Sequence, residues 1–129
     1  MRTFATQRLE AVQGKQIFEK LFVNDVCLID EFKKQISEGD QYFSEFKTII
    51  SYMDLFAKGS SLPQKKFREI KGGKLNVKQY EFKSKSLRVY VFSILGGKMI
   101  VMEGYKKNQK SDIRTFQSIV KDFISSTNL

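Results

Sequence analysis

The stretch YEFKSKSLRVYVFSILGGKMIVMEGYKKNQK, residues 80–110, decides the fold of this 129-residue chain. The apolar pattern over residues 77–83, 87–95 and 98–105 is typical of β-strands. Gly96-Gly97 is a strong signal for a two-residue hairpin, and only three residues join the first strand to the second. Strands connected so tightly must be antiparallel neighbours. The stretch therefore predicts three adjacent antiparallel strands.

The sequence before and after this stretch predicts one further strand and three helices. Residues 16–23 alternate as a strand does, and residues 28–36 have helical spacing, with Asn24-Asp25 as the expected cap. A longer helix is expected between Asp40, its cap, and Gly59, and helical spacing returns from Ile113 onwards. The predicted order is β-α-α-β-β-β-α, which indicates an α+β domain with helices packed on a mostly antiparallel sheet.

Length and composition suggest a single domain, with residues 1–15 as a polar N-terminal extension and residues 16–129 as the folded domain. No apolar run approaches the ~18 residues of a membrane span, and residues 1–15 show neither an apolar signal core nor a cleavage-site pattern, so we expect no signal peptide. A lone cysteine, Cys27, fits a reducing compartment, and the absence of histidine argues against a zinc site. We expect a cytoplasmic protein without a metal, a cofactor or a membrane partner.

The positive charge is concentrated in the second half of the chain. The net charge is +9, and residues 63–129 hold 15 of the 23 lysines and arginines but 5 of the 14 acidic residues. Such asymmetry favours a polyanionic partner, nucleic acid above all, because phosphate neutralisation releases counterions. The alternative is that the basic surface only keeps the protein in solution.

Strand alternation places Arg88 on a predicted sheet face. Successive side chains point to opposite faces, so Arg88 and Tyr90 share the face opposite to Val89. Burying an unpaired arginine is unfavourable, so we expect this face to be open near Arg88. The alternative is that Arg88 pairs across the sheet with Glu81 or Glu103, worth ~0.2–1 kcal/mol.

Basic and aromatic residues are interleaved between Tyr80 and Lys110. Between positions 83 and 110, the only acid is Glu103. Cations bind phosphate and aromatic rings stack on bases, so this mixture predicts an RNA-binding face. The basic residues are Lys83, Lys85, Arg88, Lys98, Lys106, Lys107 and Lys110, and the neighbouring aromatic residues are Tyr80, Tyr90, Phe92 and Tyr105.

The same face could cleave RNA through the neighbouring 2′-hydroxyl. Histidine, the usual base near neutral pH, is absent, but neighbouring cations can lower the pKa of a lysine until it can act as the base. Tyr105 could orient a base or donate a proton, and Arg88 could stabilise the developing charge. Glu103 is either a base or only a counter-charge for the lysines.

The succession of YEFKSKSLRVYVF (80–92), MIVMEGYKKNQK (99–110) and a terminal amphipathic helix resembles the RelE-like toxins of bacterial toxin–antitoxin systems. The HigB-like branch is the most similar. The resemblance spans residues 16–126 and is specific over 80–110. It implies a RelE/ParE-like fold and a metal-independent, ribosome-dependent mRNA endonuclease, an mRNA interferase, which a cognate antitoxin protein neutralises.

The resemblance also implies roles for particular residues. Arg88 falls on the family's phosphate-stabilising strand arginine, and Lys83 stands where the preceding strand usually carries arginine. Tyr105 takes the place of the aromatic residue before the lysine pair. We therefore expect catalysis from Arg88, Lys107, Tyr105 and Lys83, and RNA binding by Lys85, Lys106, Lys110 and Tyr90.

Two further functions are compatible with the same sequence. One is a non-catalytic, protein-binding toxin, as when ParE-type relatives inhibit DNA gyrase. The other is a degenerate domain that retains only nucleic-acid or partner binding. Cleavage of mRNA within codons would support the first hypothesis, and gyrase-linked DNA damage would support the gyrase alternative.

Overall fold

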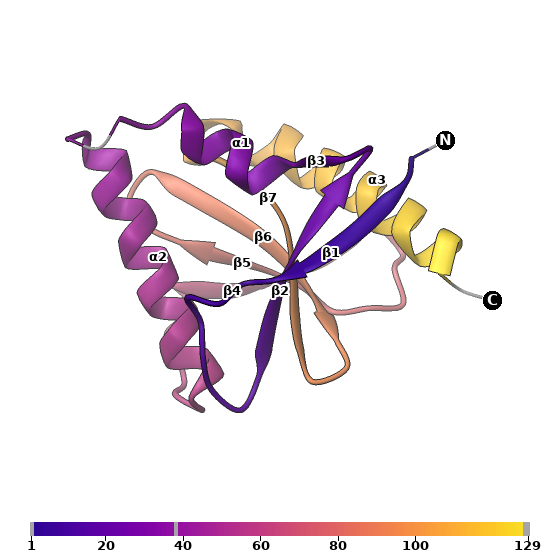
Figure 1. Ribbon diagram of the computed structural model, residues 1–129, viewed down its shortest axis with the longest axis horizontal. Coiled ribbons are helices and arrows are strands. Elements are labelled where there is room, and N and C mark those ends of the chain that lie inside the picture. Colours follow the sequence, from indigo (N-terminus) through magenta and orange to yellow (C-terminus); the bar gives the residue numbers. More distant parts are fainter. Residues whose placement is uncertain (1, 38, 128–129) are drawn as a thin grey trace.

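The computed structural model describes residues 2–37 and 39–127 and contains one mixed sheet with helices on both faces (Figure 1). The strands follow the order β1-β2-β7-β6-β5-β4, and the short β3 pairs with β2. Neighbouring strands are antiparallel except for β2 and β7, which are parallel. The elements are β1 (Phe4–Arg8), β2 (Ile17–Val23), β3 (Val26–Cys27), α1 (Leu28–Lys34), α2 (Gln41–Ala57), β4 (Phe67–Ile70), β5 (Gln79–Lys83), β6 (Leu87–Ile94), β7 (Gly97–Tyr105), the 3₁₀ turn η1 (Lys106–Asn108) and α3 (Gln109–Thr127).

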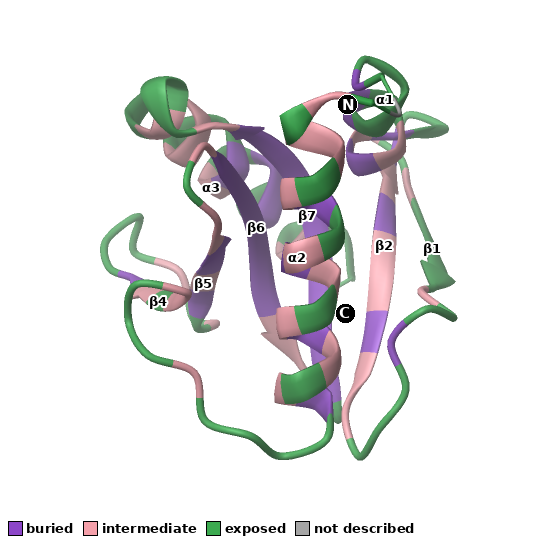
Figure 2. Cartoon of the chain, turned by 90° about the vertical axis from the view of Figure 1, so that its left-hand side faces the viewer, coloured by how far each residue is buried: buried purple, intermediate pink, exposed green. Residues whose placement is uncertain are grey.

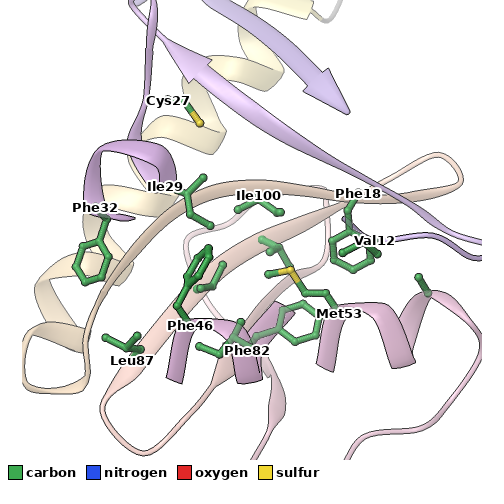
Figure 3. Packing of buried hydrophobic residues seen from close by; sticks show 14 of the residues in the cluster. Val12, Phe18, Cys27, Ile29, Phe32, Phe46, Met53, Phe82, Leu87 and Ile100 are labelled. Atoms are coloured by element: carbon green, nitrogen blue, oxygen red, sulfur yellow. The ribbon is translucent and has the colours of Figure 1, made fainter. Parts of the chain in front are cut away.

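Two hydrophobic clusters cover the two faces of the sheet. On one face α1 and α2 pack against apolar residues of β2, β5, β6 and β7, including Phe18, Leu87 and Val89 (Figure 3). On the other face α3 packs against Tyr90, Phe92 and their neighbours. The central strands are accordingly buried, whereas α2 exposes its outer side (Figure 2). The two clusters show that β6 alternates as its sequence predicts.

The α+β class and the mostly antiparallel sheet are confirmed. Strands β5, β6 and β7 lie within one or two residues of the predicted ranges, and Gly96 has a positive φ of 80° in the hairpin. Asp40 caps α2 as expected, since its side chain accepts a hydrogen bond from the Tyr42 N–H at 2.9 Å.

The predicted cap of the first helix is wrong. Asn24 and Asp25 have φ values of 50° and 67°, and they form the turn that joins β2 to β3. Such paired left-handed residues are typical of a two-residue hairpin, and asparagine and aspartate tolerate this conformation well. The residue that precedes α1 is Cys27, whose side chain makes no capping hydrogen bond.

Three strands, β1, β3 and β4, and the first turn of the last helix were not predicted. β1 lies within the segment expected as an extension and pairs antiparallel with β2, yet most of its side chains are exposed, so they leave no apolar pattern. β4 spans four residues, too few for alternation to be visible. α3 begins at Gln109, four residues before Ile113, and its first turn, Gln109–Asp112, is polar, so apolar spacing does not reveal it.

None of the helices within residues 2–37 and 39–127 combines the length and the hydropathy that a membrane crossing requires.

Candidate nucleic-acid interface

A basic pocket opens at the end of the sheet where β7 leaves it. Its volume is about 470 Å³, and of the described residues three lysines, two tyrosines and a serine line it, and no carboxylate. We call it the lysine–tyrosine pocket. The lining residues are Tyr42, Lys85, Ser86, Tyr105, Lys106 and Lys107.

Hydrogen bonds among η1, the β5–β6 loop and α2 hold the walls of this pocket together. The Lys106 N–H donates to the Ser86 carbonyl at 2.7 Å, which joins η1 to the β5–β6 loop. Glu45 of α2 accepts hydrogen bonds from the Ser84 hydroxyl at 2.5 Å and from the Ser86 N–H at 2.7 Å. The loop that carries Lys85 is therefore anchored both to the helix layer and to the end of β7.

Aromatic contacts fix the floor of the pocket. The Tyr105 ring lies 5.1 Å from the ring of Phe32 and 5.1 Å from that of Tyr42, and the latter contact is edge-to-face. The Lys107 Nζ lies 5.7 Å from the centre of the Tyr105 ring. Burial raises the pKa of the Tyr105 hydroxyl, with smaller contributions from Tyr42, Asp40 and Glu103, so the phenol keeps its proton at neutral pH.

Arg88 lies outside this pocket, and the expectation that its face is open is wrong. The residue is 6% exposed on the face of the sheet that α3 covers. One guanidinium nitrogen donates to the carbonyl oxygens of Ser84 and Leu87, each at 2.8 Å, and the Nε lies 3.9 Å from Glu81. The alternative prediction, a cross-strand pair with Glu81, is thus confirmed.

Glu81 is the centre of a polar cluster between the sheet and the start of α3. Its fully buried carboxylate accepts hydrogen bonds from Arg68 of β4 and, at 2.7 Å, from Gln109 of α3. Lys83, on the same strand face, is half-buried. Burial, reinforced by the cations Arg68, Arg88 and Lys106, lowers its pKa, despite the opposing attraction of Glu81. We call Arg68, Glu81, Arg88 and Gln109 the Glu81 cluster.

The predicted site is therefore divided between the two faces of the sheet. The register pairs Leu87 with Tyr105 and Arg88 with Gly104, so Tyr105 points toward α1 and α2 whereas Arg88 points toward α3. Lys85, Tyr105, Lys106 and Lys107 do come together, in the lysine–tyrosine pocket. Lys83 is close enough to Lys106, and to Glu81 and Arg88, for their charges to interact. It therefore lies between the lysine–tyrosine pocket and the Glu81 cluster.

Other predicted residues lie apart from the pocket. Tyr90 is fully buried against Phe116, and its hydroxyl has no hydrogen-bond partner among the described residues, so it is not available to stack on a base. Lys98 is buried with its Nζ 4.8 Å from the Phe56 ring and 5.3 Å from the Tyr80 ring. Lys110 is exposed in the first turn of α3.

Glu103 is a buried acid near the end of β7. It is 5% exposed, and neither carboxylate oxygen has a hydrogen-bond partner among the described residues. Its register partner is Val89, in the cluster beneath α1 and α2. Burial raises the pKa of Glu103 to about 8, so at neutral pH the group is mostly neutral and supplies little counter-charge to the lysines.

Sequence reasoning missed Tyr42, Glu45 and Ser86. Tyr42 belongs to the apolar stripe of α2, so its helical spacing indicated only core packing, and the pairing of Glu45 with the β5–β6 loop leaves no local signal. Within residues 2–37 and 39–127, no three His, Cys, Asp or Glu side chains form a group that could hold a metal ion.

Comparison with known proteins adds no relative: no family model matches the chain, and no curated protein or solved structure is significantly similar to it.

Proposed function

We propose that this protein is the toxin of a toxin–antitoxin pair and cleaves mRNA on the ribosome, with RNA bound in the lysine–tyrosine pocket. The observation that carries the proposal is the pocket itself, in which Lys85, Lys106 and Lys107 lie beside two tyrosine rings and none of the described lining residues is acidic. Cations beside accessible rings suit the phosphates and bases of single-stranded RNA. The resemblance of residues 80–110 to RelE-like toxins supplies the reaction, the cytoplasmic location and the antitoxin partner.

The proposed reaction uses the RNA's own 2′-hydroxyl. This oxygen attacks the adjacent phosphorus as a base takes its proton, and the 5′-oxygen of the next nucleotide leaves with a proton from an acid, giving a 2′,3′-cyclic phosphate. Lys83, whose pKa is lowered by burial and by neighbouring cations, is the proposed base. The protonated phenol of Tyr105 is the proposed acid, and Lys106 and Lys107 would stabilise the phosphorane.

A second function, binding without cleavage, is favoured by the position of Arg88. An arginine that is buried and paired with Glu81 is not free to meet a scissile phosphate in this conformation. The protein would then act by occupying a partner, either RNA or a protein such as DNA gyrase. The two functions share the pocket and differ in whether a phosphodiester bond breaks.

Inducible expression followed by mapping of mRNA 5′ ends tests the proposal. We expect growth arrest with new 5′ ends inside translated codons, and relief of both by the triple variant K85A/K106A/K107A. The control is Lys121→Ala, which removes an exposed lysine of α3 that does not line the pocket. Growth arrest without new 5′ ends would refute cleavage and support the binding function, and gyrase-linked DNA damage would identify gyrase as the target.

A further inference from the structure

We infer that the lysine–tyrosine pocket receives one unstacked base of single-stranded RNA, and that Tyr42 is the residue on which this base stacks. The inference rests on the RNA binding of the proposed function, but it needs no cleavage. It assigns a ligand contact to α2, a helix whose other face packs in the core.

The size and composition of the pocket fit a single nucleotide. Its volume of about 470 Å³ lies in the ~300–1,000 Å³ range of pockets that hold small organic ligands. Two aromatic side chains supply flat apolar surface, and three lysines lie around them. A base flanked by two phosphates has this same distribution of apolar and negative groups.

Of the two tyrosines, Tyr42 has the more available ring. The ring of Tyr105 is in contact with Phe32 and Tyr42, and Lys107 lies over it. Among the aromatic contacts of the described residues, Tyr42 has only the one with Tyr105. Because that contact is edge-to-face, it occupies at most one face of the Tyr42 ring and leaves the other free of Tyr105.

The structure holds Tyr42 in place before any ligand binds. Its backbone N–H is bound by the Asp40 side chain at the start of α2. Three residues further along α2, Glu45 fixes the loop that carries Lys85 and Ser86. The stacking face and a phosphate-binding lysine are thus anchored to the same helical turn, so little ordering is required on binding.

The test compares RNA affinity for Tyr42→Leu and Tyr42→Phe, with Tyr52→Leu as the matched control. Leucine keeps apolar packing against Tyr105 but removes the ring, and phenylalanine keeps the ring. Tyr52 lies on the same helix and is also half-buried, but it does not line the pocket, and Lys66 lies over its ring at 5.0 Å. The ligands are a short single-stranded RNA and the same RNA with abasic sites.

We expect Y42L to weaken binding of the intact RNA about tenfold, because it removes one base–aromatic stack. Y42F and Y52L should bind within about twofold of the wild type. Abasic RNA should bind wild type and Y42L equally, and the salt dependence should not change, because no cation is removed. A cooperative thermal unfolding transition is the check that each variant is folded.

The inference is overturned if folded Y42L binds intact RNA like the wild type, or if it loses the same affinity for intact and abasic RNA. In that case the proposed function stands, provided that K85A/K106A/K107A loses RNA binding. If the wild-type protein binds no single-stranded RNA, the proposed function fails, and this inference fails with it.

Discussion

The Nε of Arg88 lies 3.9 Å from Oε1 of Glu81 in the layer between the sheet and α3. The ion pair is buried, because Arg88 is 6% exposed and Glu81 is fully buried. The Nε itself has no hydrogen-bond partner among the described residues, whereas Glu81 also holds Arg68 and Gln109. Glu81 therefore connects β4, β6 and α3, and Arg88 depends on it for charge compensation.

Replacement of Glu81 by alanine should destabilise the protein by about 3–5 kcal/mol, because it leaves the Arg88 charge buried without a carboxylate. Urea denaturation measures the loss. The control is Glu69→Ala, which removes the partner of the exposed Lys71 and should change stability by less than about 1 kcal/mol. The double variant E81M/R88M should recover most of the lost stability. If E81A is as stable as E69A, the buried Arg88–Glu81 pair does not stabilise the fold.

Glu103 should make the stability of the protein fall as pH rises. Its pKa is about 8 in the folded state because of burial, against 4.5 for the free side chain, so the folded state holds the proton more tightly. Below pH 4.5 both states are protonated and ionisation does not oppose folding. Between pH 4.5 and 8 the unfolded state loses its proton first, which lowers the free energy of unfolding by up to ~1.4 kcal/mol per pH unit.

Urea denaturation of Glu103→Gln across this pH range tests that prediction. Relative to the wild type, the variant should gain stability steadily from pH 5 to pH 8, since glutamine does not titrate. The control Glu31→Gln changes an exposed residue paired with Lys34 and should show no such trend. A constant difference between wild type and E103Q across the range would mean that Glu103 keeps an ordinary pKa when folded.

The sequence predicted the middle of the sheet well because its strands are tightly connected and apolar. Alternation in residues 87–95 placed Val89 and Tyr90 on opposite faces, as found. β1 escaped prediction because an edge strand exposes most of its side chains and is held by backbone pairing with β2. Only tertiary structure decides that pairing.

The candidate site could be predicted only in part, for a geometric reason. Lys106 and Lys107 follow Tyr105 directly, so their proximity is given by the sequence itself. Arg88 was expected beside them, but its strand position places it on the α3 face, where Glu81 neutralises it. Tyr42 reaches the pocket from a helix that is distant in sequence, and helical periodicity alone cannot separate a core residue from a pocket residue.

Substitution of Gly104 by alanine should destabilise the protein by about 1–3 kcal/mol through overpacking. A methyl group there would meet the carboxylate of Asp112 in the first turn of α3. Because the obstacle is the end of a side chain, the double variant G104A/D112A should regain most of the loss. Thermal unfolding of the single and double variants measures both effects.

Gly97 provides the contrasting case for that experiment. An added Cβ would meet the backbone of Ile17, the residue with which Gly97 pairs in the parallel β2–β7 ladder. Truncation of the Ile17 side chain cannot remove a backbone obstacle, so I17A should not rescue G97A. Rescue of G97A by I17A, or no rescue of G104A by D112A, would contradict the packing described for these two glycines.

The lysines of the pocket should determine how strongly RNA binding depends on salt. Each phosphate contact with single-stranded RNA contributes about −0.7 to the slope of log affinity against log salt concentration. Lys85→Ala, Lys106→Ala and Lys107→Ala should each reduce the steepness of this slope by about that amount, measured by fluorescence anisotropy between 50 and 200 mM salt. Lys121→Ala, outside the pocket, should leave it unchanged. Equal slopes for all four variants would show that RNA does not occupy the pocket, because an ion-mediated contact cannot be removed without changing the number of counterions released.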